Sequence, residues 1–439
     1  MTETIWTVIK LGGTSQCLTG YNNLINIINK KAPNEKLIIV LSALSGTTNM
    51  LEKFIHTKDM MIIQNIITNH TKFINELKLD NFSKNFNKII ETFIKDIYDN
   101  VDSPDLDIYM QSYIIGYGEK LSTYILADYL TKYLKQKIKL LNSYDFIKSK
   151  KETFKLYPLS EFYCDYDNFI INNTSDCDVY ITQGFIASSP SNKTILLGRG
   201  GSDTTGALIS NSLNASKYIV YTDVDGIYTT DPKLYSEAKI IKKIDYQLVQ
   251  ELAAMGAKVM HPSSILPCME KNIEIYIKNT FNNKPDVYTL ITHASNNTSA
   301  IALQKNIKLI KITSENMWNN YGFVFDIFRR FSERQINVNI ISTSQFTIST
   351  TIDIEEKNKI VIQDLIQDLE DKYTVELIEN CSIISIVTNT IPEIYKNIDF
   401  SIIKHHLLSI GATNNSISFV INNSDIISSV SKLHEVIIK

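Results

Sequence analysis

The segment TILLGRGGSDTTGA, residues 194–207, decides the fold of the chain. Its first four residues are a short apolar run typical of a strand, and the loop after them holds three glycines, Arg199, Asp203 and three hydroxyl residues before an apparent helix. A helix N-terminus that follows a glycine turn favours bound negative charge. The segment therefore predicts an α/β unit with an anion site, in which Arg199 can hold a carboxylate through two parallel hydrogen bonds. Asp203 can orient such groups, anchor a lysine or simply cap the helix.

The same pattern of strand and glycine turn occurs near the amino terminus. The run 5–9 ends in Lys10-Leu11-Gly12-Gly13-Thr14-Ser15, and a second apolar run, 36–41, ends in a loop of small residues, 42–49. An ammonium beside glycine N–H groups can bind a polyphosphate, although a lysine at the end of a strand is more often only solvated. Further strand-like runs lie at 137–141, 179–182 and 218–222. Because helical patterns separate several of these runs, we predict a mostly parallel central sheet covered by helices.

The remaining segments predict the domain organisation. Between about 50 and 100 the apolar residues recur at helical spacing, which predicts a helical insertion in the first domain. The polar stretch 295–298 places the domain boundary near residue 300, so we expect domains at 1–300 and 301–439. The second domain follows an α+β order: strand, helix and two strands at 308–312, 323–335, 338–341 and 346–352. This order resembles a small regulatory ACT module, and the remaining length has room for two (βαββαβ).

Composition excludes several classes of function. The chain has 439 residues and a formal net charge of -3, and it has no dense Lys/Arg run that would attract nucleic acid or an acidic membrane. No run approaches the roughly 20 apolar residues that span a bilayer, and the amino terminus has no signal-peptide core. The five cysteines are scattered, which argues against zinc and against a disulfide framework. We therefore expect a cytoplasmic protein without a metal site built from its own side chains.

Three other stretches can carry chemistry, and each has a plainer structural alternative. Glu119 opens a helix after two glycines; it can hold an ammonium or merely favour the helix start. The stretch 222–233 can form a nucleotide loop or a surface turn rich in Asp and Gly. In the stretch 256–262, Lys258 can balance phosphate charge, whereas His261 before a proline is more often structural.

Five segments, taken in order, resemble the aspartokinase branch of the amino acid kinase family: 10–15, 118–122, 198–205, 222–233 and 251–262. The resemblance covers essentially the whole chain. It implies transfer of a phosphoryl group from ATP to the side-chain carboxylate of L-aspartate, the first step of the aspartate pathway to lysine, threonine and methionine. Magnesium is expected with ATP, bound mainly by ATP oxygens and water.

The resemblance also implies roles for individual residues. Lys10 neutralises phosphoryl oxygens and Asp203 organises the active-site lysines. The implied aspartate ligands are Ser42, Thr48, Glu119, Arg199 and Ser202. The implied nucleotide contacts are Lys10, Gly12, Gly13, Thr222, Asp223, Tyr228, Lys233 and Lys258. Two positions depart from the family pattern, since the family usually has Phe where Leu11 stands and Arg where Lys233 stands.

The C-terminal region resembles the tandem ACT region of lysine-sensitive members of this branch. The resemblance implies L-lysine as effector, a homodimer formed through the ACT region and a feedback site at its interface. The implied effector residues are Met317, Gly322, Phe323, Val324, Val338, Ser342 and Thr343. The alternative is that these residues only build a helix and a strand pair, and Asn320 departs from relatives that have a smaller hydroxyl residue there.

Other functions remain as alternatives. A kinase of glutamate, acetylglutamate or carbamate is disfavoured by Arg199 together with the ACT-like tail. A bifunctional protein with a dehydrogenase is disfavoured because the chain has no glycine-rich dinucleotide-binding half. A catalytically inactive amino-acid sensor is disfavoured by the presence of Lys10, Glu119 and Asp203.

Overall fold

A computed structural model of the chain describes residues 4–79, 84–101, 103, 106–153, 155–158, 161–171, 177–257, 260–282, 284, 286–293, 298–314, 321–353, 359–390, 399–411 and 415–438. The chain divides into two compact units. The first unit comprises Met1–Ile227, Ile240–Val249 and Val259–Ser295, and the second comprises Tyr228–Lys239, Gln250–Lys258 and Asn296–Lys439. Two short internal segments therefore group with the C-terminal region.

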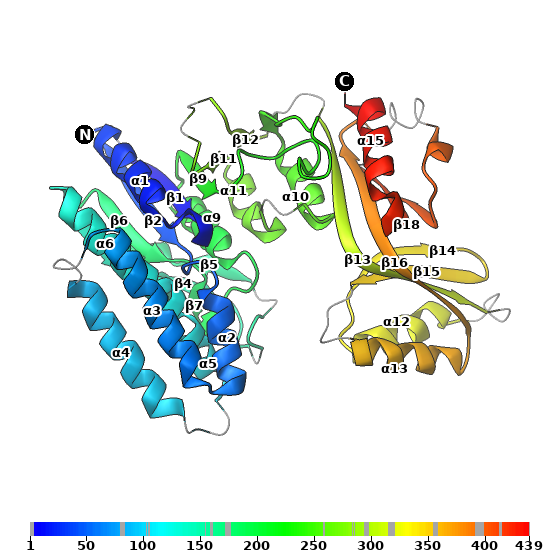
Figure 1. Ribbon diagram of the computed structural model, residues 1–439, viewed down its shortest axis with the longest axis horizontal. Helices are drawn as coiled ribbons and strands as arrows, with labels where there is room; N and C mark the ends of the chain where they lie inside the picture. The colour runs from blue at the N-terminus through cyan, green and yellow to red at the C-terminus, as the bar shows by residue number, and fades with distance from the viewer. Residues whose placement is uncertain are drawn as a thin grey trace. The chain divides into compact units, whose positions relative to one another are not determined.

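An eight-stranded sheet forms the centre of the first unit (Figure 1). Its strands, in spatial order, are β10 (Lys243–Ile244), β12 (Thr289–Ile291), β11 (Glu274–Asn279), β9 (Lys217–Thr222), β1 (Ile5–Leu11), β2 (Glu35–Leu41), β6 (Val179–Gln183) and β3 (Ile138–Leu141). Every neighbouring pair is parallel except β11 and β12. The predicted largely parallel sheet is confirmed.

One predicted strand lies outside this sheet. The run at 194–197 forms β8 (Thr194–Leu196), which pairs antiparallel with β7 (Ile186–Ser188) in a separate four-stranded sheet. The other two strands of that sheet are β4 (Ile147–Ser149) and β5 (Phe162–Cys164). The glycine loop after β8 therefore connects this smaller sheet to the helix that follows the loop.

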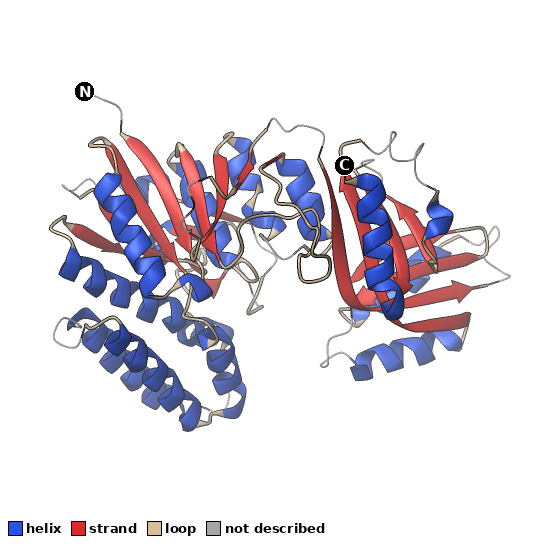
Figure 2. Cartoon of the chain, turned by 45° about the horizontal axis from the view of Figure 1, so that its top comes forward, coloured by secondary structure: helices blue, strands red, loops and turns tan. Residues whose placement is uncertain are grey.

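Helices cover both faces of the central sheet (Figure 2). On one face, Ile9 and Leu11 of β1 share an apolar core with Tyr21 and Leu24 of α1 (Leu18–Lys30) and with α6 (Tyr117–Tyr133). On the other face, α9 (Gly201–Ser212) packs against β1 and β9. A Cβ on Gly206 would lie 2.4 Å from the Tyr218 hydroxyl oxygen, so this close approach of helix and sheet requires glycine.

The first unit contains several further helices. They are α2 (Thr47–Thr57), α3 (Met60–Glu76), α4 (Lys84–Val101), α5 (Ile108–Ile115), α7 (Ser143–Phe146), α8 (Tyr166–Ile171) and α11 (Leu266–Glu270). The first three occupy the region where the sequence predicts a helical insertion, and α4 packs on α6. Another helix, α10 (Tyr246–Ala254), begins in the first unit and ends in the second.

The second unit is built on one antiparallel six-stranded sheet. Its strands, in spatial order, are β14 (Val338–Thr343), β15 (Thr347–Asp353), β13 (Ser299–Thr313), β16 (Thr374–Thr388), β18 (Ser416–Asn422) and β17 (Leu407–Ile410). Its helices include α12 (Phe323–Glu333), α13 (Lys359–Glu370) and α15 (Ile426–Ile437). The predicted order of strand, helix and two strands is confirmed by β13, α12, β14 and β15. Apolar cores lie under α12 and α13 and under α15, and a further cluster includes Ile307, Leu309 and Val420 of the sheet itself.

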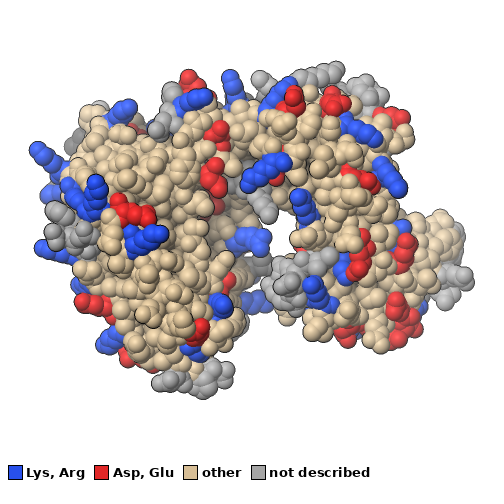
Figure 3. Space-filling model, viewed as in Figure 1, with Lys and Arg blue, Asp and Glu red and all other residues tan. Residues whose placement is uncertain are grey.

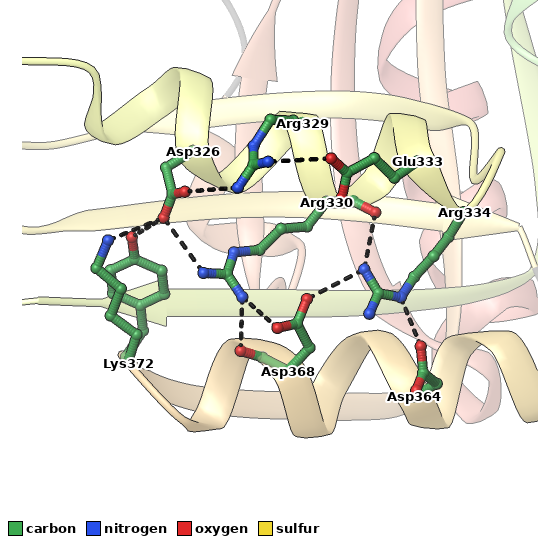
Figure 4. A network of polar contacts seen from close by, with 9 residues as sticks. Asp326, Arg329, Arg330, Glu333, Arg334, Asp364, Asp368 and Lys372 are labelled. Carbon is green, nitrogen blue, oxygen red and sulfur yellow. Dashed lines mark hydrogen bonds and ion pairs between the residues drawn. The ribbon is translucent and has the colours of Figure 1, made fainter.

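A network of ion pairs joins α12 to α13 (Figure 4). Arg330 of α12 pairs with Asp326 at 3.5 Å and also with Asp368 of α13, and Arg334 pairs with Asp368 at 3.0 Å. Lys372 donates to Asp326 at 3.0 Å. The charges in this region are therefore paired with one another.

Elsewhere on the surface, positive and negative side chains lie among one another. On the face shown in Figure 3, Lys and Arg side chains are interspersed with Asp and Glu among the described residues. Within the part of the chain that the structure describes, no helix is both long enough and apolar enough to cross a bilayer.

Candidate active site

Four strand ends meet at one edge of the central sheet. Strands β9, β1, β2 and β6 are adjacent and parallel, and Leu11 at the end of β1 pairs in register with Leu41 and Tyr221, while Leu41 pairs with Gln183. Ligands of open α/β sheets bind beyond the carboxyl ends of the strands. The loops that leave this edge carry most of the site residues that the sequence predicts for the first unit.

The centre of this edge is an ion pair between Lys10 and Asp203. The Lys10 ammonium lies 2.7 Å from a carboxylate oxygen of Asp203, and the two side chains are only 12% and 15% exposed. Asp203 lies in the first turn of α9, where a helix N-terminus stabilises negative charge. The Tyr218 hydroxyl donates to the Asp203 carbonyl at 3.0 Å. The lysine is thus held by the side chain of a residue whose backbone is hydrogen-bonded to the sheet.

Glycines keep the loops at this edge close together. The Gly12 N–H donates to the Tyr221 carbonyl at 3.3 Å. A Cβ on Gly12 would lie 3.5 Å from the Lys10 ammonium, so glycine leaves that group uncovered. A Cβ on Gly13 would lie 2.7 Å from the Ala43 carbonyl oxygen, which no real side chain could tolerate without a shift of the backbone. The loops after β1 and β2 therefore touch only because the sequence has glycine here.

Glu119 of α6 is a buried carboxylate that is only half satisfied. Its side chain is 3% exposed, and one oxygen accepts a hydrogen bond from the Ala43 N–H at 3.0 Å. The other oxygen has no hydrogen-bond partner among the described residues. Burial raises the pKa of Glu119 to about 8, against the opposing effect of the Ala43 hydrogen bond. A buried carboxylate with one open oxygen is suited to bind a cation.

The remaining predicted aspartate ligands lie on nearby loops and helix starts. Ser42 follows β2, and its carbonyl accepts from the Gln16 amide at 2.6 Å. Thr48 lies in the first turn of α2. Ser202 is 8% exposed in the first turn of α9, and a Cβ on Gly184, just after β6, would lie 2.5 Å from the Ser202 Cβ.

Arg199 stands in a loop between two glycines with left-handed backbone conformation. Its neighbours Gly198 and Gly200 have φ of +80° and +68°, and a Cβ on Gly200 would lie 2.4 Å from the Cβ of His261. The Arg199 side chain is exposed. Burial first and the Arg199 charge second lower the pKa of His261, and the Asp203 charge opposes them. His261, which the sequence favours as a structural residue, therefore lies beside two predicted site residues.

The predicted nucleotide residues are divided between the two units. Thr222 ends β9, its hydroxyl donates to the Asp223 carboxylate at 3.2 Å, and Asp223 is exposed. Tyr228 and Lys233 belong to the second unit, where Tyr228 is half-buried and Lys233 is exposed. Lys258 lies outside the described residues. The structure groups Thr222 and Asp223 with Lys10 in the first unit, and all of the nucleotide contacts stay predictions.

The predicted effector residues come from α12 and β14 of the second unit. Gly322 has φ of +85° and precedes α12, whose first residues, Phe323 and Val324, are buried and exposed, respectively. Val338, Ser342 and Thr343 lie on β14. Met317, and Asn320 with it, lies outside the described residues.

Sequence reasoning missed polar residues at the end of β11. The Thr280 hydroxyl donates to the Ser15 hydroxyl at 2.6 Å, and its N–H donates to the Thr222 carbonyl at 2.8 Å. The Asn279 amide donates to Asp225 at 2.8 Å. A signal was present, because the apolar run 273–277 ends in polar residues as the other strands of this edge do.

The acidic, histidine and cysteine side chains do not form a cluster of metal ligands among the described residues. In the described ranges, no group of three or more His, Cys, Asp or Glu residues could hold a metal ion. A Mg²⁺ bound mainly by triphosphate oxygens and water does not need such a group, so these residues fit that mode of binding.

Family models match both units. The model of the amino acid kinase family matches residues 6–279, and that of the ACT domain matches residues 310–362. Among curated relatives, aspartokinase 1, chloroplastic, of Arabidopsis thaliana is 27% identical over 98% of this chain and 79% of that protein. The lysine-sensitive aspartokinase 3 of Escherichia coli (strain K12) is 32% identical over 58% of this chain and 59% of that protein.

Solved structures share the fold. The structure of E. coli aspartokinase III in complex with lysine and aspartate (T-state) matches with a TM-score of 0.82 and 24% identity, covering 99% of both chains. The structure of the same protein in complex with aspartate and ADP (R-state) matches with a TM-score of 0.81 and 24% identity, covering 99% of this chain and 100% of that one.

Proposed function

The chain belongs to the amino acid kinase family, and from that premise we propose that it is an aspartokinase, which transfers a phosphoryl group from ATP to the side-chain carboxylate of L-aspartate and releases ADP. One observation carries the proposal. The glycine-lined edge of the sheet holds a fixed ammonium, Lys10, and a buried carboxylate with an open oxygen, Glu119. A carboxylate can bind the ammonium of an amino-acid substrate, and a lysine can neutralise the triphosphate that the substrate attacks. Relatives that match nearly the whole chain are aspartokinases.

The mechanism rests on charge neutralisation and positioning. The attacking carboxylate is already ionised at neutral pH, so the reaction needs no strong base and depends on relief of its repulsion from the triphosphate. Lys10 supplies positive charge at the glycine turn, and Asp203 keeps its ammonium in place. Mg²⁺ on the triphosphate supplies further neutralisation when it is bound with ATP.

Aspartate recognition follows from the charges at the same edge. The open oxygen of Glu119 accepts from the substrate ammonium, and the exposed guanidinium of Arg199 binds a substrate carboxylate. The hydroxyls of Ser42, Thr48 and Ser202 are the other proposed ligands of aspartate. Thr222 and Asp223 contact the nucleotide, whereas Tyr228, Lys233 and Lys258 remain predictions for that role.

Regulation belongs to the C-terminal region. We propose that residues 1–300 are catalytic, that residues 301–439 hold two ACT modules, and that L-lysine binds near Gly322, Phe323 and Val324 in a homodimer formed through this region. The ACT match over residues 310–362 supports this arrangement. A biosynthetic kinase of this kind is expected in the cytoplasm.

The test is ADP release from Mg-ATP with L-aspartate or L-glutamate, each with and without L-lysine. The proposal predicts release that depends on aspartate and is suppressed by lysine. Release with glutamate alone would indicate another member of the family. Binding of lysine without any ADP release would indicate an inactive amino-acid sensor. Aspartate-dependent release that lysine does not suppress would support the kinase activity and contradict the assignment of lysine as effector.

A further inference from the structure

A polar cavity of about 570 Å³ opens on the face of the central sheet that α1 covers. Its walls include Thr7 of β1, Ile219 and Tyr221 of β9, and Ile27 of α1. Successive side chains of a strand point to opposite faces, so Thr7 lies on the face opposite to that on which Lys10 meets Asp203. The volume falls in the range of about 300–1,000 Å³ that holds small ligands. The cavity therefore lies on the opposite face of the sheet from the Lys10–Asp203 ion pair, and its lining reaches the strand edge at Tyr221 and Asn279.

The cavity carries an excess of positive charge. Five lysines and one acidic residue line it: Lys30, Lys31, Lys217, Lys278, Lys284 and Glu35. Lys31 pairs with Asp178 at 3.1 Å, and Lys217 pairs with Glu35 at 3.5 Å. The other three lysines form no ion pair with any carboxylate that the structure describes. This local excess contrasts with the formal net charge of -3 of the whole chain.

Nearby carboxylates outside the lining are engaged in other contacts. Glu274 accepts a hydrogen bond from the Tyr276 hydroxyl at 2.7 Å. Asp225 accepts from the amides of Asn279 and Asn282 at 2.8 and 3.0 Å. Both carboxylates therefore accept hydrogen bonds from groups other than the lysines of the cavity.

The surroundings of Lys278 illustrate the excess of positive charge in the cavity. It lies on β11 in register with Tyr221, and its ammonium is 5.1 Å from the centre of the Tyr288 ring. Burial first, and the positive charge of Lys217 second, lower the pKa of Lys278. Two ammonium groups in one partly buried cavity repel each other, and a bound anion would remove that repulsion.

We propose that this cavity binds a small molecule that carries two or more adjacent phosphate groups. Lysines bind phosphate as compact point charges, whereas planar carboxylates are matched best by the arginine fork, and no arginine is among the described residues that line the cavity. The apolar side chains of Ile27 and Ile219 offer contact for the rest of the ligand.

The test uses inorganic tripolyphosphate as the probe and the full chain in isothermal titration calorimetry. Because the proposed active site can also bind a triphosphate, the titrations use the Lys10→Ala background, which removes the cation of that site and should retain binding in the cavity. Lys30→Gln and Lys278→Gln should each weaken binding about tenfold or more, as expected for loss of a charge-assisted contact. Lys150→Gln, which removes an exposed lysine paired with Glu161 elsewhere in the first unit, is the matched control and should bind normally.

Two outcomes overturn the proposal. One is loss of tripolyphosphate binding in Lys10→Ala, which would place the probe in the active site. The other is undiminished affinity when Lys30→Gln is added to that background. Lys30 is exposed at the end of α1, so this variant is expected to fold even if substitution of the half-buried Lys278 disturbs the sheet.

Discussion

Two carboxylates in the two units have opposite surroundings. Glu119 in the first unit is buried with one open oxygen, and burial raises its pKa to about 8. Asp326 in the second unit accepts from Tyr373 at 2.6 Å and from Lys372 at 3.0 Å, and these hydrogen bonds lower its pKa well below the ordinary value. Charges satisfied by their neighbours stabilise the fold, whereas a buried carboxyl group with an open oxygen is costly to ionise and is available to a cationic ligand.

The largest effect is expected for Lys10→Ala. Turnover should fall by roughly three orders of magnitude or more, because the variant lacks the fixed cation that neutralises the triphosphate. Steady-state ADP release measures it, with circular dichroism to show that the variant is folded. Lys150→Ala is the matched control, since Lys150 also forms an ion pair in the same unit, with Glu161, and lies outside both proposed sites. Near-normal turnover of Lys10→Ala would remove Lys10 from the mechanism.

The second effect is that of Glu119→Gln on aspartate binding. Loss of a charge-assisted contact should raise KM for aspartate about tenfold to a hundredfold. In the wild type, KM for aspartate should fall as pH rises from 6 to 8, because Glu119 with a pKa of about 8 ionises in that window. In the variant this dependence should vanish. An equally steep pH profile in both proteins would assign the titration to another group.

The same substitution should change stability with a defined sign. A raised pKa means that folded Glu119 retains a proton that the unfolded chain has lost, so its contribution to the free energy of unfolding decreases as pH rises from about 4.5 towards 8. Urea unfolding of the ligand-free protein at pH 5 and pH 8 measures this. Glu119→Gln should lose less stability between the two pH values than wild type loses.

An intermediate effect is expected at the glycine loop that precedes α9. Gly200→Ala should lower both stability and activity, because a Cβ there would collide with His261 and the backbone has φ of +68°. The cost should exceed the roughly 1 kcal/mol of a left-handed backbone alone. Gly46→Ala is the control, since Gly46 has φ of +83° but open space around the added Cβ. Equal melting temperatures for the two variants would show that the contact with His261 is tolerated.

The smallest effect is expected for Asp326→Asn in the network of Figure 4. At pH 7 the variant should destabilise α12 by about 1 kcal/mol, because the network is partly exposed and screened by solvent. A lowered pKa means that the stabilisation is present above the ordinary aspartate value of 3.8 and is lost as pH falls below it. Hydrogen exchange of α12 at pH 7 measures the change. Turnover without effector should stay unchanged, and a large loss of turnover would contradict the purely structural role of this network.

The sequence predicts the loops at the strand edge well, but it does not predict the state of the buried carboxyl group of Glu119. Glycine turns after apolar runs are local signals, so the loops with Gly12, Gly13 and Gly200 could be predicted from short segments. The state of Glu119 could not, because it depends on the Ala43 N–H, 76 positions away in the chain. The run 194–197 looks like any buried strand, and only its pairing with β7 removes it from the central sheet.

The most direct test of the central claim is the number of protons released when aspartate binds. Calorimetric titrations of the full chain at pH 7 in buffers of different ionisation enthalpy give this number. If Glu119 has a pKa of about 8 and receives the substrate ammonium, close to one proton, roughly 0.9, should leave on binding, and none should leave in Glu119→Gln. Binding of aspartate to wild type without proton release would contradict the claim that the open carboxylate of Glu119 is the ammonium site.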